Sequence, residues 1–291
     1  MTVTASMVKT LRDRTQASMM DCKRALVESD GDIDKAVEIM RKAGQAKAQK
    51  KSSRVAAEGT IVVLSSEDQH EAVLVEVNCE TDFVAREEKF KAYANAVASK
   101  ALELKQDGLS EALQDQIKED QINLIATLGE NVSVRRVAYR SEQEGVIGIY
   151  THGDVNGTRI GVLMALKKGS VEVARDLAMQ VAAMRPDYLT SEEIPAAIIE
   201  KEKDIILSEL RNSGRPEEKL EQIASGKLNK FKQGITLVEQ TFVKDPNKTV
   251  KQFLKESDAE PDYFVRFEVG EGIEKKEDDF VKEVMSQARG D

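Results

Sequence analysis

Thiol and imidazole side chains are scarce in this chain of 291 residues, which contains two cysteines and two histidines. A thiol becomes a nucleophile when a neighbouring base, most often imidazole, takes its proton. Neither histidine lies beside a cysteine or a serine in the sequence, so only folding could bring Cys79 and His152 together as such a pair. The alternative is that Cys79 is a buried thiol at the end of a strand. A hydrolase would lose its activity on Cys79→Ala, whereas a binding protein would tolerate that change.

Other catalytic motifs are absent from the sequence as well. It contains no glycine-rich phosphate loop, no paired metal-ligand motif and no nucleophile elbow. We therefore expect a protein that binds a partner and performs no covalent chemistry, without a cofactor and without a bound metal.

The composition is typical of a globular protein inside the cell. Charged residues make up 33% and hydrophobic residues 41% of the chain, and its length allows more than one domain. No run of about 18 uncharged apolar residues is present that could span a membrane. The N-terminus lacks the basic segment and apolar core of a signal peptide, and two cysteines cannot form a disulfide framework. A cytoplasmic location with free thiols is the expectation.

The charge of the chain argues against broad binding to nucleic acid. Its formal net charge is -9 at pH 7, whereas proteins that bind nucleic acid by counterion release present a basic face. One basic stretch contains Lys47, Lys50, Lys51 and Arg54. Its simplest interpretation is a solvated linker or a frayed helix end. The alternative is a contact with RNA, which a steep dependence of RNA affinity on salt would reveal.

Three short helices are predicted within residues 5–44, as in a ubiquitin-associated-type bundle. Apolar side chains recur there at spacings of three or four, in three groups: Val8 and Leu11; Met19, Cys22 and Leu26; Ile33, Val37 and Met40. Gly44 is placed to end the third helix. Met20 lies about 100° around the helix from Met19, so both methionines cannot face so small a core. One of them therefore either fills a gap at the core's edge or belongs to a docking patch.

An internal repeat occupies the centre of the chain. The stretch EGTIVVL at 58–64 is echoed by EGVIGIY at 144–150. Each is followed by a polar turn and a second apolar run, at 73–77 and 162–166, and then by a helical pattern. The repeated unit is thus predicted to be a β-hairpin followed by a helix, used twice.

The two copies differ in the distance between the second strand and the helix. This distance is 16 positions from Val77 to Tyr93 in the first copy and 11 from Leu166 to Leu177 in the second. The additional residues fall in the stretch NCETDFVAR at 78–86, which places a Phe beside an Asp in a polar turn. Because a scaffold used twice does not need the surplus for folding, these side chains are candidates for a partner contact.

Two other interpretations of this stretch concern folding. Phe83 could fold back as a lid on its own helix. Asp82 could be the N-cap of that helix, which would hold its carboxylate in a fixed direction and is compatible with a partner contact.

A helical hairpin is predicted after the second copy. The pattern TSEE at 190–193 resembles a capping box, and an apolar stripe follows between Ile198 and Leu210. The return helix is expected to begin at Pro216 and to stop at Gly226. Helices this polar, joined by a short turn, often project as an antiparallel arm.

The last part of the chain is predicted to contain strands and one helix. Residues 241–243 and 263–269 have the pattern of strands that return to the second sheet. A final amphipathic helix carries Phe280. We expect it to dock on another surface, because it is too exposed to be stable alone.

Three separated stretches resemble the translation elongation factor Ts family. They are RDRTQASMMDCK at 12–23, EVNCETDFV at 76–84 and RFEVGEG at 266–272, and the likeness extends in order over essentially the whole chain. The family usually carries glycines on both sides of the alanine before Met-Met, where this chain has Gln16 and Ser18. Glycine adopts backbone shapes that Gln and Ser do not, so the entry into the second helix is expected to differ.

The resemblance implies an α+β fold in five parts. These are an N-terminal three-helix module with a basic linker (1–54), a first core subdomain (55–140), a second core subdomain (141–187 and 229–269), an inserted antiparallel coiled coil (188–228) and a C-terminal helical module (270–291).

The resemblance also implies a function, that of a cytoplasmic guanine-nucleotide exchange factor for the GTPase elongation factor Tu. The segment Thr81, Asp82, Phe83 and Val84 would enter the partner beside its nucleotide site. Phe83 would wedge between partner helices, and Asp82 would disturb the coordination of Mg²⁺ without binding the metal itself. Further partner contacts are implied for Arg12, Met19, Met20, His152 and Phe280. GDP and GTP would be met only through the partner.

Overall fold

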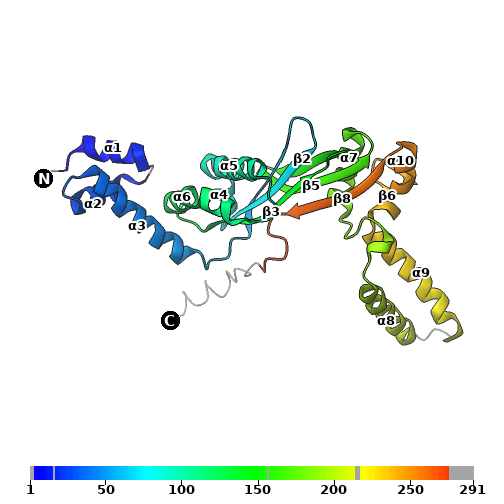
Figure 1. Cartoon of the computed structure of the whole chain (residues 1–291). Helices are drawn as coiled ribbons and strands as arrows, with labels where there is room; N and C mark the ends of the chain where they lie inside the picture. Colours follow the sequence, from blue (N-terminus) through cyan, green and yellow to red (C-terminus); the bar gives the residue numbers. More distant parts are fainter. Residues whose placement is uncertain (1–2, 16, 156, 214–216, 275–291) are drawn as a thin grey trace.

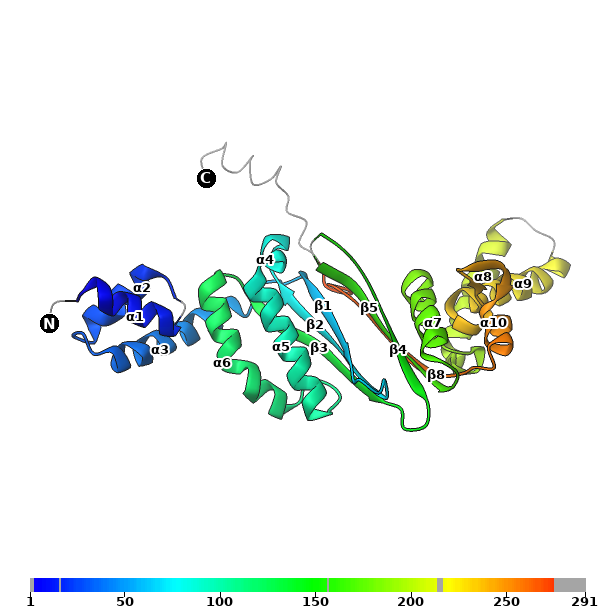
Figure 2. The ribbon, with the colours of Figure 1, turned by 90° about the horizontal axis from the view of Figure 1, so that it is seen from above.

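The computed structural model describes residues 3–15, 17–155, 157–213 and 217–274. Its elements follow one another along an elongated molecule (Figure 1, Figure 2). The N-terminal helices lie at one end, two sheets occupy the middle, and a helical hairpin lies at the other end. The predicted α+β class is confirmed. Within the described ranges no helix combines the length and the apolar composition needed to cross a membrane.

The N-terminal module consists of α1 (Ala5–Thr15), α2 (Met19–Glu28) and α3 (Ile33–Lys51). The predicted bundle is confirmed, and its small core contains Val8, Leu11, Cys22, Ala25, Leu26 and Ala36. Ser18 caps α2, because its hydroxyl accepts a hydrogen bond of 3.1 Å from the Asp21 amide. A good N-cap residue thus stands where the family usually has glycine, while Gln16 lies outside the described residues.

The third helix does not end at Gly44, as the sequence predicted, but continues to Lys51. Gly44 lies where α3 packs against α6 (Glu111–Leu128), and a Cβ at this position would be 3.4 Å from Ile122 Cγ2. This glycine therefore lies within the contact between two helices and not at a helix end.

The first sheet has three antiparallel strands in the order β1-β2-β3. The hairpin of β1 (Glu58–Ser65) and β2 (Glu71–Cys79) was predicted, whereas the third strand, β3 (Val132–Ser141), was not. After β2 come the five-residue helix α4 (Asp82–Arg86) and the longer α5 (Glu88–Leu104). Side chains of α5 and α6 share one hydrophobic core with this sheet. The additional residues of the first repeat copy thus include a separate short helix, α4.

The second sheet repeats this plan with β4 (Val146–Asp154), β5 (Gly157–Lys168) and β8 (Glu260–Glu268). The strand predicted at 263–269 is confirmed as β8, which pairs with β5 in this sheet. Helix α7 (Val171–Met184) packs on this sheet directly after β5, without a counterpart of α4.

The strand predicted at 241–243 does not join the second sheet. Its residues form β6 (Thr241–Phe242), which pairs with β7 (Asp245–Thr249) in a separate two-stranded sheet. The ring of Phe242 stacks on that of Phe253 in α10 (Val250–Glu256), with centroids 4.2 Å apart. This local aromatic contact packs β6 against α10, and β6 does not become a strand of the second sheet.

The two sheets pack against each other, with helices on their outer sides (Figure 2). At Gly161 on β5, a Cβ would lie 2.6 Å from side-chain atoms of both Ile61 and Leu74 in the first sheet. The absence of a side chain there lets the sheets approach closely, and Ile147 and Leu163 complete the shared core. The repeat therefore builds one body from two similar halves.

The inserted arm consists of α8 (Ala196–Asn212) and α9 (Glu217–Ile235). The predicted stop at Gly226 is wrong, since α9 runs through it. A single glycine costs a helix only about 1 kcal/mol relative to alanine, which neighbouring helix formers offset. The predicted capping box is not formed: the segment contains a 3-10 helix, Ser191–Glu193, and the Thr190 side chain accepts no cap hydrogen bond from it.

Candidate partner-binding site

The two faces of α4 differ in exposure. Thr81 caps this helix, because its hydroxyl accepts a hydrogen bond of 3.4 Å from the Val84 amide. Val84 and Ala85 are buried in the core of the first sheet. Phe83 points the other way and is 73% exposed. In a chain with only 4% aromatic residues, an aromatic side chain held in solvent by an anchored helix is a candidate contact for a partner.

Neither folding interpretation of this stretch agrees with the structure. The exposure of Phe83 contradicts a lid. Asp82 is not the N-cap, since Thr81 occupies that position and Asp82 is the first residue of α4. The Asp82 carboxylate instead pairs with the Arg86 guanidinium at 2.5 Å, four residues later. The same guanidinium lies 5.8 Å from the centroid of the Phe83 ring. Arg86 thus contacts both candidate side chains and limits their orientations.

Cys79 is fully buried at the end of β2. Its thiol donates a hydrogen bond of 3.1 Å to the Thr81 carbonyl. Burial, together with the nearby carboxylates of Glu130 and Glu58, raises the pKa of this thiol to about 12. Cys79 is therefore protonated at neutral pH, and its hydrogen bond goes to a carbonyl oxygen and not to His152. These features fit the structural interpretation of Cys79 and not a nucleophile.

We expect Cys79 to resist thiol reagents in the folded protein. A pKa of about 12 leaves only about one thiol in ten thousand ionised at pH 8. A Cys22→Ala variant, in which Cys79 is the single thiol, should be labelled only after unfolding, as colorimetric thiol titration with and without denaturant would measure. Rapid labelling of the folded variant at pH 8 would contradict this expectation.

The N-terminal module presents both of its adjacent methionines to solvent. Met19 is 58% and Met20 74% exposed, so the prediction that Met19 contributes to an apolar inner face is wrong. They occupy the first turn of α2, and the core of the small bundle is already filled by Cys22 and Leu26. Arg12 is exposed on α1. Flexible, polarisable methionine side chains suit an adaptable docking surface.

The hairpin of β4 and β5 carries the remaining described candidate, His152, which is exposed near the end of β4. Val155, three positions later in the turn, is 85% exposed, and the sequence analysis missed this residue. The hairpin is tied to the first sheet, because the Thr60 hydroxyl donates a hydrogen bond of 3.4 Å to the Thr158 carbonyl. An exposed apolar tip is therefore held in place by the body.

The elements that carry these side chains, α2, α4 and the end of the β4–β5 hairpin, lie along one edge of the molecule in Figure 2. With Arg12 on α1, the described candidates are thus distributed over four separate elements. Phe280, the last predicted partner contact, lies outside the described residues.

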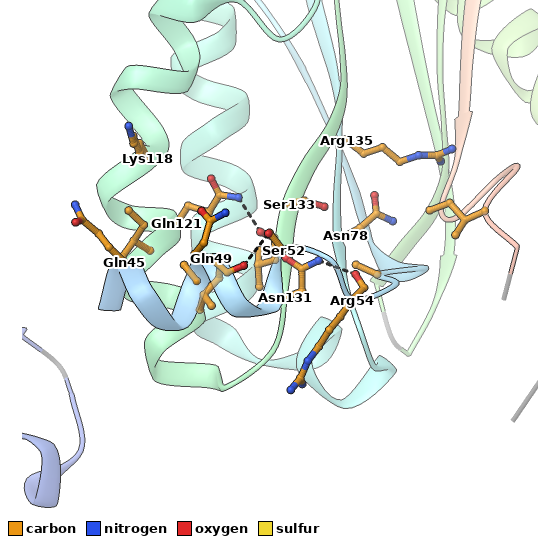
Figure 3. A pocket seen from close by; sticks show the side chains of 16 residues that line it. Gln45, Gln49, Ser52, Arg54, Asn78, Lys118, Gln121, Asn131, Ser133 and Arg135 are labelled. Carbon is orange, nitrogen blue, oxygen red and sulfur yellow. Dashed lines mark hydrogen bonds between the residues drawn. The ribbon is translucent and has the colours of Figure 1, made fainter. Parts of the chain in front are cut away.

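A cavity of about 740 Å³ lies between α3, α6 and β3 (Figure 3). Among the described residues that line it there is no histidine, cysteine or carboxylate, so it contains none of the His, Cys, Asp or Glu side chains that most often serve in acid-base catalysis. Some of its amide side chains bind the chain itself, as Gln121 Nε2 donates to the Val132 carbonyl at 2.7 Å. The part of the chain that is described also lacks any group of three or more His, Cys, Asp or Glu side chains that could hold a metal ion.

Two residues around α4 were missed by the sequence analysis. Arg86 lies four positions after Asp82, and this spacing of opposite charges on a helix was an available signal. Glu130 accepts a hydrogen bond of 2.6 Å from the Thr81 hydroxyl although it lies 49 positions away. No local pattern could have indicated that contact.

The fold and this surface define a class: an α+β protein that presents exposed apolar side chains on folded elements, as partner-binding proteins do. A family model described as Elongation factor TS matches residues 80–271. The chain is 49% identical to elongation factor Ts of Alkalilimnicola ehrlichii, over 100% of both chains. It is 48% identical to that of Legionella pneumophila strain Paris over 99% of both chains, and 47% identical to that of Thioalkalivibrio sulfidiphilus over 100% of both. The chain belongs to the elongation factor Ts family of translation elongation factors.

Proposed function

We propose that this protein is a guanine-nucleotide exchange factor that binds elongation factor Tu carrying GDP and accelerates the release of GDP. The observation that carries the proposal is Phe83, held 73% exposed beside Asp82 on an anchored helix. Membership of the elongation factor Ts family supports the identity of the partner. No bond is made or broken in this activity, so it needs neither a nucleophile nor a cofactor.

In the proposed mechanism, α4 enters the partner beside its nucleotide site. Phe83 separates partner helices and thereby displaces the groups that hold Mg²⁺ and phosphate. Asp82 brings a negative charge near a site built for a cation and phosphates, which disturbs the metal's coordination electrostatically. Arg86, which pairs with Asp82 and lies over the Phe83 ring in the free protein, orients both side chains before the partner is bound.

The energy required explains why one side chain is not enough. A GTPase that binds GDP at nanomolar strength holds it with about -12 kcal/mol, and each tenfold loosening requires about 1.4 kcal/mol. A loosening of a hundred thousandfold therefore needs about 7 kcal/mol, which comes from binding the nucleotide-free partner better than the GDP form. We propose that Arg12, Met19, Met20, His152 and Phe280 contribute to this difference as further partner contacts. By the same linkage, GTP displaces the factor.

The proposal is tested by release of a fluorescent GDP analogue from purified elongation factor Tu. Catalytic amounts of this protein should accelerate release in the presence of excess unlabelled GDP. If the release rate is the same with and without the protein, over a concentration range reaching that of the GTPase, the proposed function is wrong.

A Met19→Ala/Met20→Ala variant should bind the partner more weakly while keeping its maximal exchange rate. Burial of one Met side chain contributes about 1.5–3 kcal/mol, so the factor concentration for half-maximal exchange should rise at least about tenfold. The maximal rate should change little, because α4 is untouched. Val27→Ala, which removes another exposed apolar side chain of α2, is the matched control. A lower maximal rate with unchanged half-saturation would contradict this role.

A further inference from the structure

The start of α4 is held by a turn that is distant in the sequence. This turn, residues 129–131, joins α6 to β3. The Glu130 carboxylate accepts three hydrogen bonds from the segment before α4: from the amides of Glu80 at 3.1 Å and Thr81 at 3.0 Å, and from the Thr81 hydroxyl at 2.6 Å. Hydrogen bonds to a charged acceptor are stronger than those between neutral groups. A helix of five residues is too short to be stable alone, so these bonds help to fix where it begins.

The hydroxyl of Thr81 connects Glu130 to the helix cap. A hydroxyl has one proton to donate and two lone pairs to accept with. Because the proton goes to Glu130, the lone pairs are free for the Val84 amide, which donates to the hydroxyl at 3.4 Å. Glu130 thus sets the orientation of the cap, and the cap precedes Asp82 and Phe83 directly.

The same turn is bonded to the end of the N-terminal module. The Lys51 ammonium group donates to the Gly129 carbonyl, and Asn131 Nδ2 donates to the Arg54 carbonyl at 2.8 Å (Figure 3). Glu80 also binds this turn, because its carboxylate accepts a hydrogen bond of 2.6 Å from the backbone amide of Asn131. Lys51 and Arg54, both from the basic stretch, therefore have a structural role. They connect the end of α3 to the turn that holds α4.

We propose that Glu130 is a positioning residue for nucleotide exchange. It acts through Thr81 to aim Asp82 and Phe83, and the turn at 129–131 keeps α4 in a constant relation to the N-terminal module. This inference rests on the proposed exchange activity. Glu130 does not itself need to touch the partner for this role.

A double-mutant cycle separates aiming from general support of the fold. Glu130→Ala should lower the maximal exchange rate by roughly tenfold, the order expected for losing a hydrogen bond to a charged group, with half-saturation changed much less. In a Phe83→Ala background the same change should cost less than about twofold, because residues that act through one another are not additive. A full further tenfold loss in that background would overturn the proposal.

Conservative and control variants complete the cycle. Glu130→Gln keeps one carbonyl acceptor and should retain more of the exchange rate than Glu130→Ala. Glu103→Ala removes an exposed carboxylate on α5 and should leave the rate unchanged. If Glu130→Gln is as impaired as Glu130→Ala, and both act only by lowering the melting temperature, the role is structural and the proposal is wrong.

Amide hydrogen exchange in the isolated protein tests the positioning step without the partner. The amides of Glu80 and Thr81 should exchange faster in Glu130→Ala than in the unmodified protein, with α5 amides unchanged. Unchanged protection of both amides would overturn the inference. If the unmodified protein fails to accelerate GDP release, the proposed function is wrong, and this measurement still decides whether Glu130 holds α4.

Discussion

A variant carrying Asp82→Ala and Phe83→Ala is expected to lose most of its ability to accelerate GDP release. Aromatic anchors of an interface typically contribute about 2 kcal/mol or more, which corresponds to a rate loss of about 30-fold or more. Removal of the Asp82 carboxylate should add to this loss, because it takes away the charge that would disturb Mg²⁺ coordination. The release rate of a fluorescent GDP analogue from elongation factor Tu measures the effect.

The fold should survive this double change. Phe83 is largely in solvent, and the Asp82–Arg86 pair is a partly exposed ion pair of the kind that contributes little stability. The melting temperature should therefore stay within a few degrees of that of the unmodified protein. Ile205→Ala, which removes an exposed apolar side chain on α8 far along the molecule, is the matched control for activity. Acceleration that survives the double change would leave Asp82 and Phe83 without the proposed role.

Replacing Glu76 by alanine is expected to produce the largest loss of stability. Glu76 is completely buried, and its carboxylate binds Arg135 Nη1 at 3.1 Å and Arg136 Nε at 2.6 Å. It also accepts from the Gly270 amide at 2.9 Å, which connects β2 to the segment after β8. Removing one partner of a buried ion pair typically costs about 3–5 kcal/mol, because the remaining charges lose their compensation.

Thermal unfolding measures this second effect. For a chain of this size each kcal/mol lowers the melting temperature by about 2–4 °C, so Glu76→Ala should melt about 10 °C lower. Glu88→Ala removes a carboxylate that is 91% exposed and paired with Lys91, and it should change the melting temperature by no more than a degree or two. Equally small shifts for both variants would show that the contacts of Glu76 between the two sheets contribute little to the free energy of unfolding.

Local patterns in the sequence predicted a large part of this architecture. The three-helix module followed from apolar spacings such as Val8 and Leu11, and the two hairpins followed from the repeat. The position of α4 followed from the difference in length between the copies, which singled out the stretch with Asp82 and Phe83. The helix and strand predictions succeeded because side-chain periodicity along one element reports which face is buried.

Predictions about helix ends and caps were less successful. Gly44 and Gly226 were expected to end helices, but α3 and α9 run through them. Asp82 was one candidate for the cap of α4, but Thr81 caps the helix with Glu130 as its partner. Intrinsic preferences of this kind are worth only about 1 kcal/mol, so packing of α3 on α6 or a few hydrogen bonds from a distant part of the chain can reverse them.

The sequence by itself determined the class of fold and the repeated halves, since each helix or strand pattern depends on residues close together in the chain, and it predicted the stretch with Asp82 and Phe83 as a partner contact. Only the tertiary structure decided that β3 completes the first sheet, that Glu76 joins the two sheets, and that Glu130 holds the start of α4. The physical reason is that carboxylates withdrawn from water and sheet edges take whichever hydrogen-bond partners the folded chain brings to them. Those partners lie tens to hundreds of residues away, where no local spacing records them.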